Sequence, residues 1–215
     1  MKRIAVILAG NGVFDGSEIH EVTMSLYAIS KQGGVYEIFA PNIEQHHVIN
    51  HLTGEEMNEK RNVLIESARI ARGKIRDLNE LNVSDFDALI VPGGFGVAKN
   101  LSDFAFKGTE MTVLKAFEDV LLEFVKQSKP IGALCISPAI IAKILEEVTI
   151  TIGNDNDTII AVEAMGAMHK ITEHGEVVID QKYKLATTPC YMLDATIAEI
   201  GDGAKNVVEA VFEMI

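Results

Sequence analysis

The chain has 215 residues, of which 48% are hydrophobic, so it can bury the core of one large domain. Its formal net charge of −12 leaves no diffuse basic surface to neutralise phosphates or anionic lipids, and we expect neither a nucleic acid nor a membrane as partner. Two cysteines, Cys135 and Cys190, are too few for a disulfide framework. They indicate free thiols in a reducing compartment, which favours a cytoplasmic location.

Apolar runs rich in Val and Ile alternate with segments of helical period along most of the chain. The runs predict strands at residues 4–8, 35–39, 88–91, 131–134 and 148–152. Helices are predicted at residues 18–31, 58–72, 112–127, 138–145 and 157–165. Continuous apolar strands joined by helices imply a mostly parallel sheet covered on both faces. No repeat or Pro/Gly/Ser-rich linker divides the chain, so we predict a single α/β domain over residues 1–215.

The first apolar run is too short to span a bilayer and lacks a convincing cleavage site, so we interpret it as a strand. A glycine-rich loop at residues 10–16 follows this strand and leads into the first helix. The loop contains neither the dinucleotide fingerprint nor the Lys-Ser/Thr of a P-loop. We therefore do not expect this loop to bind a nucleotide.

Two glutamates at the start of that helix are candidate acids. Asp15 and Glu18 have capping-box spacing, which gives Glu18 a structural explanation. Glu21 lies three residues further on, shares a helical face with Glu18 and has no comparable local explanation. Both glutamates stay candidates for a carboxylate that takes part in chemistry at the carboxyl ends of the strands, where ligands bind in such sheets.

Paired glycines follow the strand at residues 88–91, in the sequence Val-Pro-Gly-Gly-Phe-Gly. Glycine permits positive φ and lets backbone N–H groups approach a ligand closely. One interpretation is a turn that simply needs glycines. The other is an oxyanion hole, in which the amide of Gly94 acts together with the amide of Ile136.

The next strand ends on Cys135, which is flanked two residues away on each side by Ala133 and Ser137. A residue on a sharp strand-to-helix turn needs small neighbours, because larger side chains collide where the backbone folds back. Pro138 is then suited to the first turn of the following helix. The pattern indicates a nucleophile elbow with a reactive thiol, and the alternative is a buried cysteine at the end of a strand.

The last part of the chain is predicted to close the fold. Short strands at residues 177–180 and 184–186 are expected to form an antiparallel pair, and residues 193–214 a helix interrupted at Gly201 and Gly203. The loop at residues 187–191 either forms a wall of the site or starts this helix. We interpret Cys190 in that loop as a core thiol.

The histidines offer no clear metal site. His46, His47 and His51 share no catalytic spacing with an acidic or cysteine ligand, so we expect a surface or interface loop. His174 and Glu176 have the His-x-Glu order of a glutaminase triad, but they fall at an expected hairpin turn. We therefore expect no bound metal and no glutamine hydrolysis.

Several motifs together resemble a known family. They are Ala-Leu-Cys at 133–135, Val-Pro-Gly-Gly at 91–94 running on to Lys-Asn-Leu at 99–101, Gly-Val-Phe-Asp-Gly-Ser-Glu-Ile-His-Glu at 12–21, Val-Ile-Asn-His-Leu-Thr-Gly-Glu at 48–55, Glu-Lys-Arg-Asn-Val-Leu-Ile-Glu at 59–66 and Thr-Thr-Pro at 187–189. The chain resembles the PfpI-like branch of the class I glutamine amidotransferase-like superfamily. Within that branch it is most similar to the ElbB-type proteins, which are named for enhancing lycopene biosynthesis.

This resemblance implies a flavodoxin-like sandwich and a cysteine whose thiolate is poised by a glutamate. It implies a glyoxalase that converts glyoxal to glycolate without glutathione, metal or other cofactor. It also implies that the protein forms a homodimer. Cys135 is then the nucleophile that attacks a small dicarbonyl substrate. Its partner is Glu18 or Glu21, and the distance from Glu21 to the glycine pair at residues 33–34 slightly favours Glu21.

One departure from related glyoxalases is the lack of a histidine near the cysteine. Ile136 follows the cysteine, and residues 149–153 contain no histidine. A complete Cys-His-acid triad is therefore not expected, and we expect weak activity. The alternative is a redox-sensing, chaperone or regulatory protein linked to isoprenoid biosynthesis, in which the same cysteine is oxidised.

Overall fold

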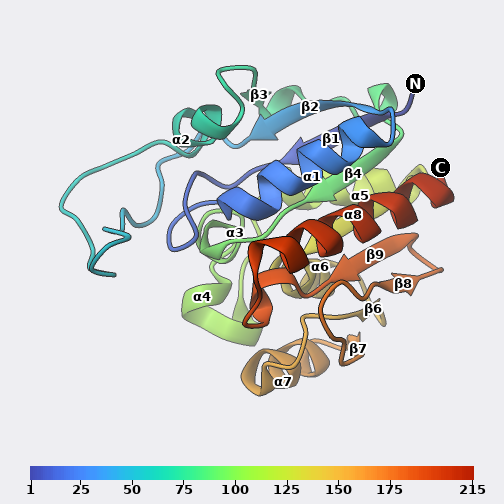
Figure 1. Ribbon diagram of the computed structural model, residues 1–215. Helices are drawn as coiled ribbons and strands as arrows, with labels where there is room; N and C mark the ends of the chain where they lie inside the picture. Colours follow the sequence, from blue (N-terminus) through green and yellow to red (C-terminus); the bar gives the residue numbers. More distant parts are fainter.

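A seven-stranded sheet forms the centre of the computed structural model, which describes residues 1–215 (Figure 1). In spatial order its strands are β3 (Arg76–Asp77), β2 (Val35–Ala40), β1 (Arg3–Ile7), β4 (Ala88–Val91), β5 (Ile131–Leu134), β9 (Leu185–Thr188) and β8 (Val178–Asp180). Neighbouring strands run parallel except β8, which is antiparallel to β9. Every residue of β4, β5 and β9 is buried, as expected of parallel strands covered on both faces.

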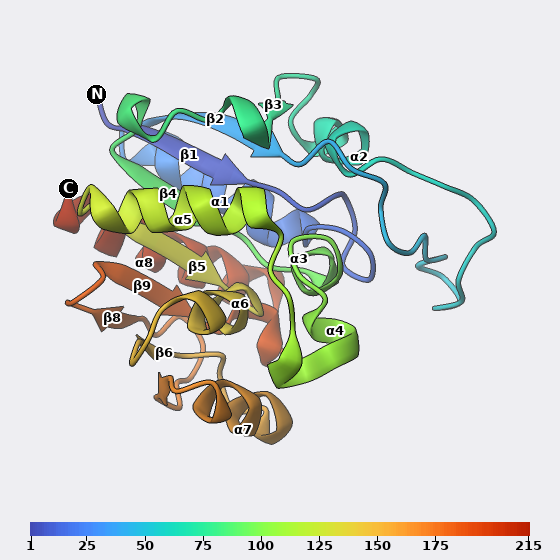
Figure 2. The ribbon, with the colours of Figure 1, turned by 180° about the vertical axis from the view of Figure 1, so that it is seen from behind.

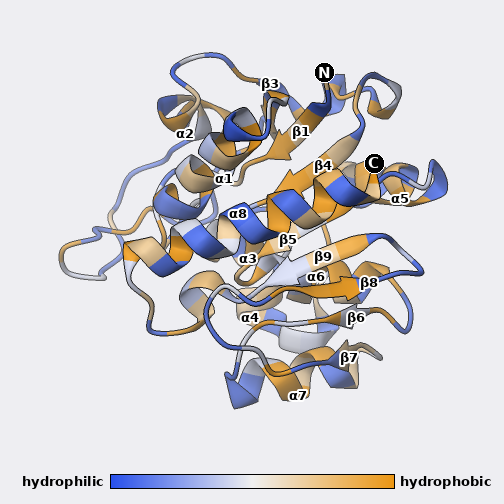
Figure 3. Ribbon diagram, turned by 45° about the vertical axis from the view of Figure 1, so that its right-hand side comes forward, coloured by the Kyte–Doolittle hydropathy of each residue, from blue (hydrophilic) through white to orange (hydrophobic).

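Helices cover both faces of this sheet, so the predicted flavodoxin-like α/β sandwich is confirmed. On one face, α1 (Ile19–Lys31) and α8 (Ile197–Met214) lie side by side (Figure 1). On the other face lie α5 (Lys115–Lys126) and α6 (Ser137–Ile144), which Figure 2 shows from behind. Figure 3 shows the sheet as the apolar centre, with polar residues on the outer sides of the helices.

The two faces have separate hydrophobic cores because side chains alternate along each strand. In β1, Ile4 and Val6 point toward α1 and α8, whereas Ala5 and Ile7 point toward the face that carries α5. Burial of these side chains contributes roughly 1.5–3 kcal/mol for each large one. The sheet is thereby held between two helical layers that fix the ends of its strands.

Shorter elements complete the fold. The remaining helices are α2 (Val63–Ile70), α3 (Phe95–Lys99), α4 (Phe104–Lys107) and α7 (Asn156–Ala164). Single 3-10 turns occur at Leu78–Glu80, Val83–Asp85, Gly108–Glu110 and Cys190–Met192. No helix combines the length and the apolar composition needed to cross a membrane.

Three sequence predictions need correction. The predicted strand at 148–152 is reduced to β6 (Thr149–Ile150), which pairs with β7 (Met168–His169) in a separate small sheet. The predicted helix at 58–72 begins only at Val63, because the side chain of Asn62 caps it. The closing helix is not interrupted, since α8 runs continuously through both glycines.

Candidate active site

The backbone turns sharply at Cys135, directly after β5. This residue has a φ of 60°, a left-handed conformation that is uncommon and costly for any residue except glycine. Its N–H donates to the carbonyl of Thr188 at 3.0 Å, and the hydroxyl of Ser137 donates to the carbonyl of Pro92 at 2.8 Å. Pro138 lies in the first turn of α6. The predicted elbow geometry is therefore present, and only 7% of Cys135 is exposed.

The carboxyl group of Glu21 faces this thiol from the first turn of α1. Glu21 is completely buried, and its Oε2 accepts a hydrogen bond from the N–H of Gly93 at 2.8 Å. Its Oε1 accepts from the N–H of Tyr191 at 3.4 Å. A Cβ atom at Gly93 would come within 2.8 Å of Glu21 Oε2 and 2.9 Å of Cys135 Sγ, so only glycine leaves room for this approach.

Glu18 lies next to this pair but has a different role. It is the N-cap residue of α1, and its Oε2 accepts a hydrogen bond from the N–H of Glu21 at 2.8 Å. Asp15 does not form the expected capping box with Glu18, because its carboxylate accepts from the N–H of Ile49 at 2.6 Å instead. Of the two candidate glutamates, the structure places Glu21 against the thiol and Glu18 at the helix end behind it.

The two expected backbone donors also meet at the cysteine. The N–H groups of Gly94 and Ile136 both act on the sulfur of Cys135 as hydrogen-bond donors. Gly94 has a φ of 101°, and a Cβ atom there would lie 2.4 Å from the backbone of Glu18 and of Gly16. This glycine makes the turn and also brings an amide to the thiol, and its role in an oxyanion hole stays a prediction.

The proton distribution of this site follows from burial. Burial, together with the nearby Glu18 carboxylate, raises the pKa of Glu21 to about 8. Burial likewise raises the pKa of the Cys135 thiol, and a charged Glu21 adds to this effect, whereas the amides of Gly94 and Ile136 act in the opposite direction. Glu21 is therefore protonated at neutral pH, and a neutral Glu21 imposes no charge repulsion on a thiolate at Cys135.

A pocket of about 360 Å³ opens onto the cysteine. Most of its walls are apolar, and they come from five separate parts of the chain. The lining residues are Val13, Gly94, Phe95, Ala98, Phe104, Ala105, Cys135, Ile136, Asp155, Thr158, Tyr191 and Met192. The loop at 187–191 thus does form a wall of the site, through Tyr191.

No histidine lines this pocket. His20 reaches it only indirectly, because its Nδ1 lies 2.8 Å from the hydroxyl of Tyr191. His174 is in a turn and lies 3.8 Å from Glu199, at the start of α8. The His-x-Glu order around residue 174 is therefore unrelated to the cysteine.

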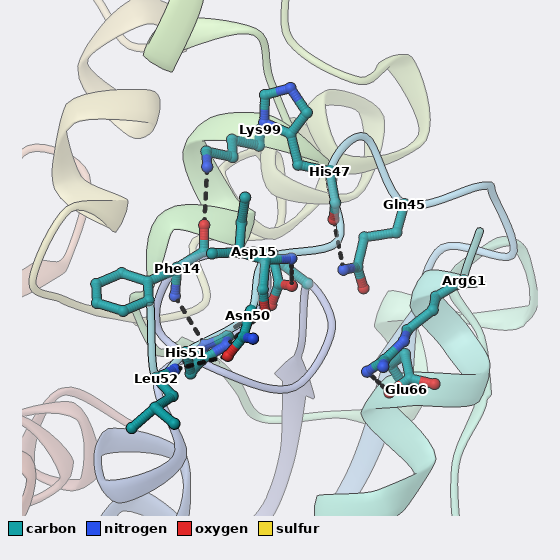
Figure 4. Close-up of polar contacts among 12 residues, drawn as sticks. Phe14, Asp15, Gln45, His47, Asn50, His51, Leu52, Arg61, Glu66 and Lys99 are labelled. Atoms are coloured by element: carbon teal, nitrogen blue, oxygen red, sulfur yellow. Dashed lines mark hydrogen bonds and ion pairs between the residues drawn. The ribbon is translucent and has the colours of Figure 1, made fainter. Parts of the chain in front are cut away.

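Three further histidines, His46, His47 and His51, belong to the long connection between β2 and α2, which packs on the loop after β1 (Figure 4). His51 Nε2 accepts a hydrogen bond from the N–H of Phe14 at 3.2 Å, and the same nitrogen lies 3.8 Å from Asp15. His46 packs on the ring of Phe106, with ring centroids 4.3 Å apart. No group of three or more potential ligands in the chain is arranged to hold a metal ion.

Proteins with related sequences cover nearly the whole chain. The human glutamine amidotransferase-like class 1 domain-containing protein 3, mitochondrial, is 46% identical, over 99% of this chain and 83% of that protein. The ES1 protein, mitochondrial, of Danio rerio is 35% identical, over 98% and 85%. The chain belongs to the ES1 family of glutamine amidotransferase-like class 1 domain proteins. The sequence matches no family model.

Solved structures agree with this assignment to the ES1 family. An isoprenoid biosynthesis protein with amidotransferase-like domain from Ehrlichia chaffeensis has a TM-score of 0.93 and 35% identity, over 100% of this chain and 99% of that one. Drosophila melanogaster DJ-1beta has a TM-score of 0.57 at 18% identity, over 99% and 95%, and so shares the fold. The predicted membership of the amidotransferase-like superfamily, with its PfpI-like fold, is confirmed.

The expected cytoplasmic location is wrong. Three curated members of the ES1 family, from human, rat and zebrafish, carry the word mitochondrial in their names. The argument for the cytosol relied on the small number of cysteines. That number indicates only a reducing compartment, and a reducing compartment is not restricted to the cytosol.

Proposed function

We propose that this protein is an ElbB-type glyoxalase, independent of glutathione and metal, which converts glyoxal or a similar small 2-oxoaldehyde to a 2-hydroxy acid. The observation that supports this proposal most strongly is the fully buried carboxyl of Glu21 against the thiol of Cys135. A thiol and a proton-transfer group side by side are what an internal redox reaction between two adjacent carbons requires.

The proposed reaction begins when the thiol of Cys135 releases its proton to water and its sulfur attacks one aldehyde carbon. The carbonyl oxygen becomes an alkoxide, which the amides of Gly94 and Ile136 stabilise and the protonated Glu21 neutralises, giving a hemithioacetal. The Glu21 carboxylate then removes the proton from the sulfur-bearing carbon, which gives an enediolate, and returns it to the neighbouring carbon, while the hydroxyl proton of the first carbon passes to the oxygen of the second. The first carbon is thereby oxidised to a thioester and the second reduced to an alcohol, and water releases glycolate and the free thiol.

The raised pKa of Glu21 suits both steps. A carboxyl with a pKa of about 8 donates a proton readily near neutral pH, and its conjugate base is stronger than an exposed carboxylate. No histidine is needed for this sequence, because Glu21 alone carries the proton in each direction. The weak activity expected without a histidine is part of the proposal.

The experiment is glycolate production from glyoxal by metal-free protein without glutathione. We expect Cys135→Ser to lose turnover, and Glu21→Gln to lose roughly 10²–10⁴-fold while it still forms a hemithioacetal adduct detectable by mass. Glu18→Gln is the matched control, because glutamine still accepts the cap hydrogen bond, and it should keep most of the turnover. Glycolate formation that survives in Cys135→Ser would refute the proposal.

A redox sensor is the second candidate, and the same geometry favours it. The amides of Gly94 and Ile136 and the protonated Glu21 present three donors around the sulfur of Cys135, where they could hold the oxygens of a sulfinate. Peroxide would oxidise the thiolate stepwise to the sulfinate and be reduced to water. Stable sulfinate at Cys135 at low peroxide, without turnover of any dicarbonyl, would favour this role over the glyoxalase.

A further inference from the structure

The pocket at Cys135 is poorly matched to glyoxal. Glyoxal consists of two carbon and two oxygen atoms, whereas the pocket measures about 360 Å³ and nine of its 12 lining residues are hydrophobic. A volume of this size is typical of sites for much larger ligands. A small polar dicarbonyl would leave most of the apolar wall in contact with water. The shape and chemistry of the pocket thus indicate a substrate with an apolar body.

A second hollow adjoins this pocket. It measures about 320 Å³ and shares the lining residues Phe95 and Ala105 with the first, so the two hollows are neighbours, and together they are called the groove. Its other lining residues are Phe14, Ile49, Gly54, Lys99 and Phe106. The rings of Phe95 and Phe106 are 50% and 46% exposed, although large aromatic side chains are normally covered. Exposed aromatic walls are typical of a binding groove.

Lys99 is the cation in this second hollow. Its ammonium donates a hydrogen bond to the carbonyl of Phe14 at 2.8 Å (Figure 4). It also lies 5.6 Å from the centre of the Phe95 ring. The nearest acids are Asp15 and Glu56, but neither forms an ion pair with it. Partial burial lowers the pKa of Lys99, and the carboxylates of Asp15 and Glu56 act in the opposite direction without forming an ion pair.

Helix α3 sets the distance between the two ends of the groove. Gly94, which precedes the helix, gives its amide to Cys135, and Lys99 is the last residue of the helix. At about 1.5 Å per residue, five residues put the backbones of Gly94 and Lys99 roughly 7.5 Å apart along α3. The Phe95 ring lies along the path between them. A ligand with a reacting carbonyl at one end and a negative charge at the other fits this arrangement.

We infer that the preferred substrate is an aryl or similarly apolar 2-oxoaldehyde with an anionic group at its far end, which Lys99 binds. This inference rests on the proposed glyoxalase function for the reacting end. The apolar body lies against Phe95 and the other walls of the groove, and the carboxylate or phosphate accepts hydrogen bonds from the free donors of Lys99. The role of Lys99 is positioning and specificity, since it does not touch the reacting atoms.

The turnover test compares 4-carboxyphenylglyoxal with phenylglyoxal, which differ only in the charged group. We expect the wild type to prefer the carboxylated compound about tenfold in kcat/KM, equivalent to about 1.4 kcal/mol, and to lose this preference at high salt. Lys99→Met should abolish the preference, because it lowers kcat/KM about tenfold for the carboxylated compound and much less for phenylglyoxal. Lys99→Arg should retain it, and Lys107→Met on the neighbouring helix α4 (Phe104–Lys107) is the matched control.

A binding test separates this inference from the proposed function. Calorimetry on Cys135→Ser compares 4-acetylbenzoate with acetophenone, neither of which has an aldehyde to turn over. Tighter binding of 4-acetylbenzoate that depends on Lys99 supports an anion-binding role for Lys99. If this result is obtained and no glyoxal is converted, only the proposed function fails. Equal binding of the two probes, or an equal loss for both in Lys99→Met with unchanged thermal stability, overturns the inference.

Discussion

At the scale of single residues, burial and contacts distinguish two neighbouring glutamates, of which only one lies against the thiol of Cys135. Glu18 accepts a backbone hydrogen bond at the end of α1, whereas Glu21 is completely buried and faces the thiol. Identical side chains three residues apart thus have different environments. The spacing in the sequence could not separate them, because residues three apart lie on the same face of a helix.

The charge of Glu21 should control the titration of Cys135. Both the charge and the hydrogen bonding of Glu21 raise the pKa of the thiol, whereas the amides of Gly94 and Ile136 lower it. Replacing Glu21 with Gln removes the charge, keeps a side chain that can hydrogen-bond to the thiol, and keeps the two amides. We therefore predict that Glu21→Gln lowers the pKa of Cys135, measured from the pH dependence of its alkylation by iodoacetamide.

Cys190 is followed separately in this measurement, because burial and then the charge of Glu21 raise the pKa of its thiol as well. It is also buried, and its thiol should react slowly in both proteins, so mass spectrometry of the labelled peptides assigns each rate to one cysteine. A pKa of Cys135 that rises in Glu21→Gln would contradict the prediction. It would mean that protonated Glu21 stabilises the thiolate by more than the charged form opposes it.

At the scale of secondary structure, α8 supports the site through α1. The two helices pack side by side, and α8 buries Val207, Val208 and Val211 beneath them. Its N-terminus has a complete capping box between Thr196 and Glu199. We predict that Thr196→Ala lowers the free energy of unfolding by about 1 kcal/mol, measured by urea denaturation.

The matched control for this change is Thr196→Ser, which keeps the capping hydroxyl and removes only a methyl group. Its stability should stay within a few tenths of a kcal/mol of the wild type, because Ser and Thr cap helices almost equally well. Glyoxal turnover should be unchanged in both variants under folding conditions, since neither residue lines the pocket. Equal losses of stability in Ala and Ser variants would show that the cap contributes nothing.

The elements that could be predicted are those with a continuous apolar signal. β4 and β5 have the predicted bounds because fully buried strands are apolar at every position. α3 and α4 were missed because helices of five and four residues are shorter than one hydrophobic repeat. The uninterrupted α8 was also missed: a Cβ at Gly203 would lie 3.2 Å from Cys190 Sγ, so this glycine serves close packing and not a break.

The residues of the candidate site also divide into those that a local sequence pattern predicts and those that no such pattern predicts. Cys135, Gly94 and Ile136 could be named from the sequence, because the elbow and the paired glycines are local patterns. The groove could not, since Phe95 and Tyr191 reach it from segments that are far apart in the chain. Lys99 appears in the sequence only as part of a motif, and its place at the end of the groove depends on the length of α3.

At the scale of the whole molecule, burying the carboxyl group of Glu21 is unfavourable for the free energy of folding. A fully buried carboxyl between a thiol and two backbone amides is an unfavourable place for a charge. The fold tolerates it by keeping Glu21 neutral, which ties the stability of the protein to pH. The layers on both faces of the sheet exclude the water that would otherwise solvate the carboxylate.

We predict that the stability of the wild type falls between about pH 5 and about pH 8 relative to Glu21→Gln. The pKa of Glu21 is about 8 in the folded protein against 4.5 in the unfolded chain. Below pH 4.5 Glu21 is protonated in both states. Between pH 4.5 and about pH 8 it is protonated only in the folded state, so rising pH increasingly favours the unfolded state. The slope is at most about 1.4 kcal/mol per pH unit and vanishes above the folded pKa. Urea denaturation of both proteins across this range measures the difference, in which titrating groups remote from Glu21 cancel. Parallel profiles would show that Glu21 is charged in the folded protein.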